Sequence, residues 1–151
     1  MRIISGYLKG KKINLPKDNL TRPLKDIVKE SIFNIIEHSK DLNLDIEGAK
    51  ILDLFSGSGS FGLECLSRGA ENVIFIENYK TAIEILEENI KRLNCEKKCK
   101  ILKSDCFNLS KNFDQQIDII FMDPPFKEKK INELIDLILE IKILKKKGLI
   151  I

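Results

Sequence analysis

The chain has 151 residues, a mass of 17.3 kDa and a formal net charge of +3. With 43% hydrophobic and 32% charged residues, it holds enough apolar material for one core, which excludes a chain that is disordered throughout. No apolar run is long enough to cross a bilayer, and the N-terminus lacks the apolar core of a signal peptide, so we expect a cytoplasmic protein.

The positive charge is concentrated at the N-terminal end. Residues 1–29 hold eight Lys or Arg and two Asp or Glu, so the rest of the chain is net negative. A basic end predicts a polyanionic partner, whereas the alternative is that lysine is simply abundant here. The candidate residues for binding this polyanion, an RNA if the resemblance described below holds, are Arg2, Lys9, Lys11, Lys12 and Arg22.

The cysteines do not predict a disulfide framework or a metal site. The four are Cys65, Cys95, Cys99 and Cys106. Cys95 and Cys99 form a Cys-x3-Cys pair, but the single histidine, His38, is distant in the sequence, so the usual set of four zinc ligands is missing. We therefore expect four reduced thiols, no bound metal, and a surface position for His38 near the end of a helix.

The first elements in chain order are a small β unit and a helix. Residues 1–20 predict a basic β-hairpin extension, followed by a main domain over residues 21–151. Pro23 fits the first turn of a helix, since its missing N–H is unpaired there in any case, and apolar residues at helical spacing extend this helix from 21 to 39.

From residue 50 onward, apolar strands alternate with helices. Strands are predicted at 51–55, 72–76, 100–102, 117–122 and from 148, with helices at 61–68, 79–93 and 131–144. Repeated β-α-β units predict an α/β fold with a mainly parallel, Rossmann-like sheet and helices on both faces. Such a sheet binds its ligand at the carboxyl ends of the strands.

A glycine-rich turn follows the first of these strands. Gly57, Gly59 and Gly62 satisfy the G-x-G-x-x-G pattern, and Glu77 ends the next strand, where a carboxylate can accept from ribose hydroxyls. This pattern alone does not separate a nicotinamide dinucleotide from S-adenosylmethionine. Asp53 favours S-adenosylmethionine, because a carboxylate is poorly placed beside a pyrophosphate and well placed for a cationic amino-acid group.

The second chemical motif is Asp123-Pro124-Pro125-Phe126, which follows the fourth predicted strand. Two prolines stiffen this loop, so that the Asp123 carboxylate and the Pro124 carbonyl form two preset acceptors. The exocyclic amine of a nucleobase offers two matching N–H donors, and Phe126 can stack on the base.

These residues resemble known enzymes. Asp-Pro-Pro-Phe resembles the motif of amino methyltransferases, and the segments 22–34, 52–64, 67–70 and 123–126 together resemble the bacterial 16S rRNA guanine-N2 methyltransferases. The basic start from Arg2 to Lys12 is similar to the N-terminal hairpin of that family. The chain departs from it at Leu24, where the family usually has Thr, and by ending in the fifth strand, before two further strands expected for the fold.

The resemblance implies a class I methyltransferase that moves a methyl group from S-adenosylmethionine to the N2 amine of a guanine in 16S rRNA. It implies a monomer whose target lies within a small-subunit particle. The cofactor's methionine end would meet Asp53, Ser56, Gly57 and Gly59, its ribose Glu77 with Asn78 alongside, and its adenine Asp105 and Cys106. The target base would meet Asp123, Pro124 and Phe126.

Three other functions remain open from the sequence. The Asp-Pro-Pro-Phe loop suits any exocyclic amine, so the chain could methylate adenine N6 or cytosine N4 in DNA or RNA. The glycine pattern alone is compatible with a nicotinamide-dependent oxidoreductase. The fold could also be kept in a non-catalytic RNA-binding assembly module. Binding of S-adenosylmethionine against NAD, and methyl transfer to rRNA against DNA, separate these possibilities.

Overall fold

The computed structural model describes residues 1–17, 24–39, 42, 44–109, 113 and 115–151. The helices are α1 (Asp26–His38), α2 (Ser60–Ser67), α3 (Lys80–Arg92) and α4 (Ile131–Glu140), and the short 3-10 turns are η1 (Glu96–Lys98) and η2 (Cys106–Asn108). The strands are β1 (Lys50–Leu54), β2 (Asn72–Glu77), β3 (Cys99–Lys103), β4 (Ile117–Met122) and β5 (Leu144–Ile150).

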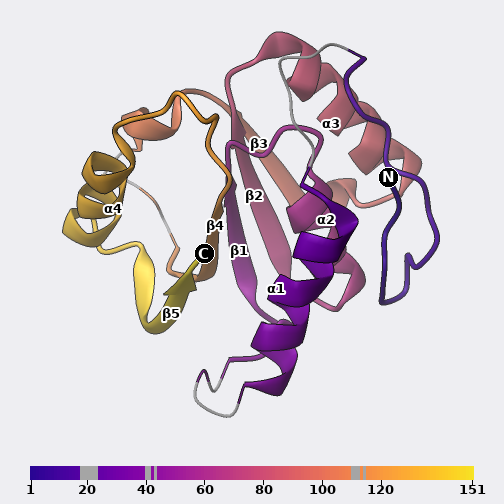
Figure 1. Ribbon diagram of the computed structural model, residues 1–151, viewed down its shortest axis with the longest axis horizontal. Helices are drawn as coiled ribbons and strands as arrows, with labels where there is room; N and C mark the ends of the chain where they lie inside the picture. The colour runs from indigo at the N-terminus through magenta and orange to yellow at the C-terminus, as the bar shows by residue number, and fades with distance from the viewer. Residues whose placement is uncertain (18–23, 40–41, 43, 110–112, 114) are drawn as a thin grey trace.

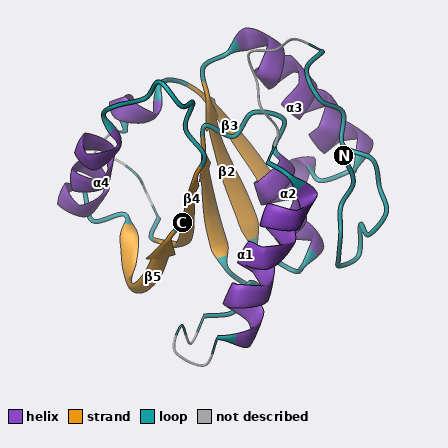
Figure 2. Cartoon of the chain, in the orientation of Figure 1, coloured by secondary structure: helices purple, strands orange, loops and turns teal. Residues whose placement is uncertain are grey.

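The five strands form one parallel sheet in the order β3-β2-β1-β4-β5. Helices α1, α2 and α3 cover one face and α4 covers the other (Figure 1; Figure 2). The chain leaves β1 toward β2 on one side and reaches β4 on the other, so the strand order reverses beside β1. Ligands of open parallel sheets bind at such a switch point, outside the carboxyl ends of the strands.

Alternate residues of the central strands face two separate cores. Ile51 and Phe75 join the core beneath α1 to α3, whereas their neighbours Leu52 and Ile76 join the core beneath α4. All four side chains are at most 1% exposed. Burial of each such side chain contributes about 1.5–3 kcal/mol, so both faces hold the strands in register.

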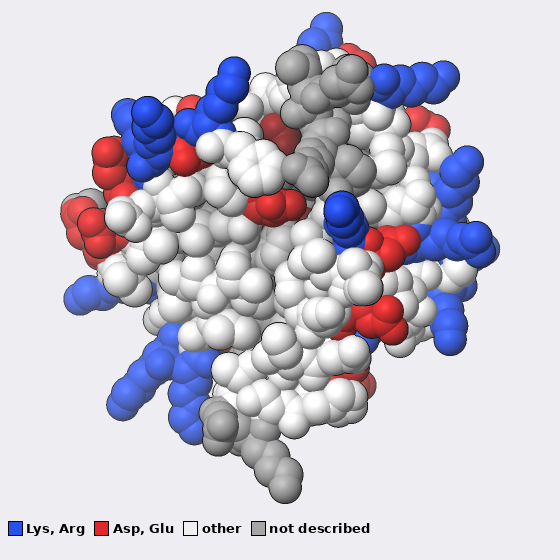
Figure 3. Space-filling view, viewed as in Figure 1, with Lys and Arg blue, Asp and Glu red and all other residues white. Residues whose placement is uncertain are grey.

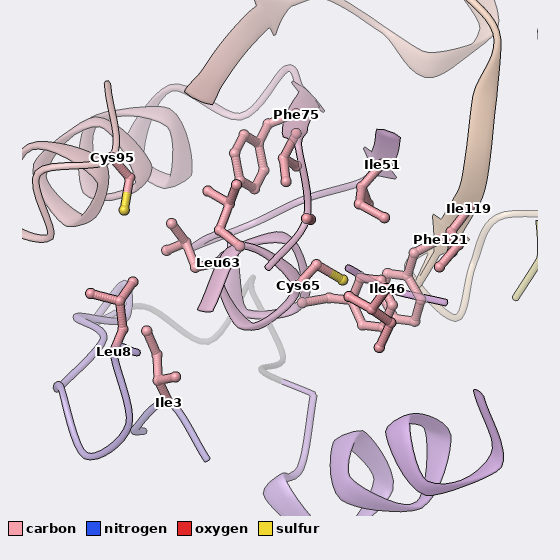
Figure 4. Packing of buried hydrophobic residues seen from close by; sticks show 14 of the residues in the cluster. Ile3, Leu8, Ile46, Ile51, Leu63, Cys65, Phe75, Cys95, Ile119 and Phe121 are labelled. Atoms are coloured by element: carbon pink, nitrogen blue, oxygen red, sulfur yellow. The ribbon is translucent and has the colours of Figure 1, made fainter. Parts of the chain in front are cut away.

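The N-terminal segment is part of the first core. Figure 4 shows Ile3 and Leu8 in one cluster with Leu63 of α2. The predicted hairpin is reduced to a single antiparallel bridge between Arg2 and Lys12, and residues 1–17 contain no strand. The amides of Ile3 and Ile13 donate to the carbonyls of Lys11 and Met1 across this bridge. The amides of Ile4 and Ser5 donate to Glu64 instead, which holds the segment against α2.

Gly6 shows how closely this segment approaches α2. The amide of Tyr7 donates to the Ser67 carbonyl at 2.8 Å, and the amide of Leu8 donates to Ser67 Oγ at 2.9 Å. A Cβ at Gly6 would lie 1.6 Å from the Ser67 carbonyl oxygen, and its φ is +78°. Only glycine fits here.

Three predicted boundaries are wrong. The fifth strand begins at Leu144 rather than at 148. The last helix ends at Glu140 rather than at 144, because Lys142 adopts a left-handed backbone (φ +57°) and the chain turns into β5 at Leu144. The first helix begins at Asp26, with Leu24 and Lys25 extended or irregular before it, while residues 21–23 lie outside the described part. His38 is the exposed last residue of α1, as predicted.

None of the helices within the described residues is both long and apolar enough to span a bilayer.

Candidate active site

Four strand ends bring the predicted site residues to one edge of the sheet. Asp53 lies near the end of β1, Glu77 ends β2, Asp105 follows β3 and Asp123 follows β4. The charges of Glu77 and Asp123 both act on Asp53 and raise its pKa. The carboxylates therefore share one site, and their summed field favours a cationic ligand.

The glycine-rich turn between β1 and α2 is tightly built except at Gly57. The Gly59 amide donates to the Ser56 carbonyl at 2.8 Å, and a Cβ at Gly59 would lie 2.4 Å from the Leu86 side chain. Gly57 has a φ of +53°, and a Cβ there would meet no atom closer than 4.0 Å. Gly57 is thus the point of the turn where a ligand can approach the backbone.

Glu77 binds this turn with its carboxylate. Its Oε2 accepts from the Gly57 amide at 2.8 Å, and its Oε1 accepts from the amides of Asn78 and Tyr79, each at 2.9 Å. The Glu77 side chain is 9% exposed. Three N–H donors fix a carboxylate at the end of β2, the position where the sequence predicts an acceptor for ribose hydroxyls.

Asp53 accepts a hydrogen bond from a second glycine amide of the G-x-G-x-x-G pattern, that of Gly62. Its Oδ2 accepts from the Gly62 amide at 3.0 Å, in the first turn of α2. The residue is 1% exposed, and burial is the largest cause of its raised pKa. Because the residue is this buried, Asp53 acts on the site by fixing the position of the turn.

These two contacts separate the candidate cofactors. In a dinucleotide site, amides of the glycine turn and of the helix N-terminus hold a pyrophosphate. Here the Gly57 and Gly62 amides already donate to the carboxyl groups of Glu77 and Asp53, so neither is left to hold a pyrophosphate. The turn fits the sulfonium and ammonium charges of S-adenosylmethionine, and disfavours the dinucleotide alternative.

Asp105 and Cys106 are the candidate site residues that follow β3. Asp105 Oδ1 accepts from the Phe107 amide at 3.0 Å and caps the short turn η2. Cys106 is 3% exposed, and burial raises the pKa of its thiol to about 12, so it is a neutral, uncharged neighbour of Glu77. Phe55 and Phe107 pack edge to face with ring centroids 6.4 Å apart.

The Asp123–Phe126 loop projects from the end of β4 toward solvent. Asp123 is exposed, Pro124 is partly buried and the Phe126 ring is 90% exposed. The Glu128 amide donates to the Pro125 carbonyl at 2.8 Å and closes a turn directly after the motif. The loop therefore holds its polar and aromatic groups at the surface of the sheet edge, where a large substrate can reach them.

The remaining predicted residues divide into two groups. The Ser56 hydroxyl donates to the Ile76 carbonyl at 3.3 Å, which joins the turn to β2, while Asn78 is exposed beside Glu77. Four basic residues of the N-terminal segment are exposed: Arg2, Lys9, Lys11 and Lys12. Arg22 lies outside the described residues.

A buried charged cluster behind the site was not predicted. Lys29 and Glu64 are both 0% exposed, with Lys29 Nζ 3.5 Å from Glu64 Oε2. Lys29 also donates to Ser60 Oγ at the start of α2, and Arg68 Nε donates to Glu64 Oε1 at 3.1 Å. The amides of Ile4 and Ser5 complete the acceptor pattern of Glu64. The cluster joins α1, α2 and the N-terminal segment.

Asn89 makes a second unpredicted junction. It is 0% exposed, and its Nδ2 donates at 3.0 Å to the carbonyls of both Asn14 and Ser58. It therefore fixes the glycine-rich turn to the N-terminal segment through α3. The signal for Glu64 was visible in the sequence, since it is the only charged residue of the eight in α2; Asn89 gave no comparable signal.

The architecture and the site define a Rossmann-like fold of the class I S-adenosylmethionine-dependent methyltransferases. The solved structure of yhhF from Escherichia coli superposes with a TM-score of 0.82 at 31% identity, over 99% of this chain and 78% of that one. The chain belongs to the family described as Conserved hypothetical protein 95, whose model matches residues 1–151.

Two relatives align with nearly the whole chain. YlbH of Bacillus subtilis is 38% identical over 154 residues, which cover 100% of this chain and 80% of YlbH. Ribosomal RNA small subunit methyltransferase D of Haemophilus influenzae is 34% identical over 153 residues, which cover 99% of this chain and 76% of that protein. The family resemblance expected from the sequence is confirmed.

Proposed function

We propose that the protein transfers a methyl group from S-adenosylmethionine to the exocyclic N2 amine of a guanine in 16S rRNA. We propose further that it acts as a monomer, in the cytoplasm, on rRNA already assembled in a small-subunit particle. The name of the Haemophilus influenzae relative supports an rRNA of the small subunit as the substrate. The choice of guanine N2 rests on the sequence resemblance.

One observation carries the choice of cofactor. The two backbone amides that would hold a phosphate are bonded to Glu77 and Asp53, and Asp123 adds a third carboxylate to the same edge. A cation is the ligand that such a site prefers. S-adenosylmethionine supplies, when bound, an electrophilic methyl group on a positively charged sulfur.

We assign the cofactor contacts along this edge. Asp53, Ser56, Gly57 and Gly59 surround the methionine end, Glu77 accepts from the ribose hydroxyls with Asn78 beside it, and Asp105 and Cys106 face the adenine. The open space at Gly57 and the fixed carboxylate of Glu77 fit this assignment.

The Asp123–Phe126 loop would receive the target base. The guanine amine is a weak nucleophile, because its lone pair is delocalised into the ring. Hydrogen bonds from its two N–H groups to the Asp123 carboxylate and the Pro124 carbonyl favour a pyramidal nitrogen and orient its lone pair. Phe126 would stack on the base once it has been turned out of the RNA, a step that costs a few kcal/mol. Placement and preset acceptors thus provide the catalysis, and the proton that the amine loses on methylation passes to Asp123 or to water.

The exposed basic residues Arg2, Lys9, Lys11 and Lys12, together with Arg22, would hold the RNA backbone. They lie on the segment that Glu64 and Asn89 fix to the turn of the site. The substrate-holding segment and the cofactor turn are therefore parts of one rigid assembly.

The test is methyl transfer followed by identification of the product nucleotide. Small-subunit particles, naked 16S rRNA and duplex DNA are each incubated with the protein and labelled S-adenosylmethionine, and digested nucleosides are separated. We expect N2-methylguanosine from the particle. N6-methyladenine or N4-methylcytosine would establish the amino methyltransferase alternative, and cofactor binding with no transfer to any of the three would support a non-catalytic module.

A further inference from the structure

Three lysines follow the Asp123–Phe126 loop directly and have no role in the function proposed above. Lys127, Lys129 and Lys130 lie between β4 and α4, and all three side chains are exposed. Within the described part of the chain, none of the three makes an ion pair. Figure 3 shows basic side chains projecting from the surface in the region of this loop.

The backbone of this segment is held in place, and Glu128, the acidic residue among the three lysines, is part of that structure. The Glu128 amide donates to the Pro125 carbonyl at 2.8 Å, and Glu128 Oε1 accepts from the Lys130 amide at 2.8 Å. Glu128 is therefore bonded to the loop backbone rather than to a lysine side chain. The result is a row of three cations on a defined turn.

An exposed aromatic ring precedes this row. The Phe126 side chain is 90% exposed and contributes little to either core. Nucleic-acid-binding surfaces combine aromatic rings with lysines, because the ring stacks on a base while the cations contact phosphates. The order Phe126, Lys127, Lys129, Lys130 places both kinds of group on one surface loop.

We propose that Lys127, Lys129 and Lys130 form a second phosphate-binding surface, which holds the RNA backbone on the α4 side of the target nucleotide. The inference rests on the proposed function, in that the substrate is RNA. The N-terminal segment packs on the α1–α3 side of the sheet, whereas this loop leads to α4 on the other side (Figure 1). A nucleotide turned out between the two surfaces would have its backbone held on both sides.

The geometry limits which phosphates the loop can reach. Lys127 is four residues and Lys130 seven residues from Asp123, so an extended chain of that length spans at most about 14–25 Å. The turn closed at Glu128 shortens this distance. The contacts therefore go to phosphates close to the target nucleotide, not to a remote part of the RNA.

The test is the salt dependence of binding to a 16S rRNA transcript by the protein with all three lysines changed to Ala. Each lost phosphate contact reduces the slope of log K against log salt by about 0.7–0.9, so the slope should flatten by about 2–3. Between about 50 and about 200 mM salt, the wild-type protein should then lose about 16- to 64-fold more affinity than the variant. Binding of S-adenosylmethionine should not change.

Lys97, Lys98 and Lys100 provide the matched control. They are also exposed and make no ion pair among the described residues, but they lie at the amino end of β3, at the opposite edge of the sheet. Changing these three to Ala removes the same charge and should leave the slope as it is. An unchanged slope in the loop variant, or an equal flattening in both variants, would overturn the proposal.

The same experiment distinguishes this inference from the proposed function. Binding is measured without methyl transfer, so the slope reports on the loop even if the wild-type protein methylates no guanine. Failure of methyl transfer by the wild-type protein would contradict the proposed function alone. Retained methyl transfer with an unchanged slope in the loop variant would contradict the loop alone.

Discussion

Glu77 is the residue whose removal should affect cofactor binding most directly. Its carboxylate is already oriented by three backbone amides, so it loses little freedom when it accepts from ribose hydroxyls. Charge-assisted hydrogen bonds of this kind contribute about 1.5–3 kcal/mol. Glu77→Ala should therefore weaken S-adenosylmethionine binding by about 10- to 150-fold in calorimetry. Glu71→Ala, at the exposed start of the same segment, is the control and should bind normally; equal affinities in the two variants would remove Glu77 from the site.

We expect Asp53 to lower the free energy of unfolding at neutral pH while it supports binding of the cofactor. Its pKa in the folded protein is raised above the ordinary value of about 3.9. The folded state therefore keeps a proton that the unfolded chain releases, and the stability contributed by this group falls as pH rises from the ordinary value through the raised one. Each unit of raised pKa corresponds to about 1.4 kcal/mol.

Asp53→Asn removes this dependence, because the amide oxygen can still accept from the Gly62 amide and does not titrate. In urea unfolding, the advantage of the variant over the wild-type protein should grow between pH 5 and pH 8, while its affinity for S-adenosylmethionine falls. Asp136→Asn, on the exposed surface of α4, should show no such pH-dependent difference. A variant less stable than the wild-type protein at pH 8 would mean that Asp53 is held ionised at little cost.

At the scale of elements, packing of α2 on the sheet requires a glycine. A Cβ at Gly62 would lie 2.4 Å from the Phe75 ring and 2.7 Å from Val73. Helix propensity alone favours Ala over Gly by about 1 kcal/mol. The clash should reverse that sign, so we expect Gly62→Ala to lower the free energy of unfolding by about 1–3 kcal/mol. Ser31→Ala, at an exposed position of α1, should instead be neutral or slightly stabilising in the same denaturant titration.

Every predicted strand and helix from residue 50 onward exists, because long apolar runs separated by glycine turns leave few alternatives. The fifth strand was predicted to begin at 148, so the first part of β5, which includes Lys145 to Lys147, was missed. The register shifts there from an Ile117–Leu144 pair to an Ile119–Leu149 pair, so the lysines occupy an irregular stretch of the strand. Neither a lysine run nor a sequence period predicts such an irregularity.

Helix α1 shows a second limit of sequence patterns. The apolar residues at helical spacing in this helix are Ile27, Val28, Ile32, Ile35 and Ile36. Ile36 is buried and Ile32 half-buried, but Ile27, Val28 and Ile35 are 72%, 44% and 61% exposed. The buried face also carries Lys29 and Phe33, because Glu64 of α2 lies opposite the Lys29 ammonium. A buried charge depends on a partner distant in sequence, and periodicity within one helix cannot supply that partner.

The gathering of the candidate residues at one edge of the sheet could be predicted from the sequence, and their roles stay predictions. Asp53, Glu77, Asp105 and Asp123 each end or follow a strand, and parallel strands bring such positions to one edge. Their hydrogen bonds could not be predicted in this way. That Gly57 donates to Glu77 and Gly62 to Asp53 depends on the backbone geometry of the turn.

Across the whole molecule, negative and positive side chains gather in different regions, one for the proposed cofactor and one for the proposed RNA substrate. The sheet edge gathers carboxylates around the glycine-rich turn, which suits a cationic cofactor, while the N-terminal segment and the loop before α4 present lysines to an anionic RNA. The Asp123–Phe126 loop lies where these two regions meet. Asp123 should therefore govern transfer of the methyl group rather than binding of either partner.

The role of Asp123 in methyl transfer is tested most directly by single-turnover methyl transfer at saturating RNA and cofactor. Asp123→Ala should reduce the rate by about 10²- to 10³-fold, as loss of a preset polar group does, with S-adenosylmethionine affinity unchanged. Asp123→Asn should keep more activity, because its amide oxygen still accepts one hydrogen bond. A rate for Asp123→Ala close to that of the wild-type protein would contradict the account, since the loop would then be only a structural turn.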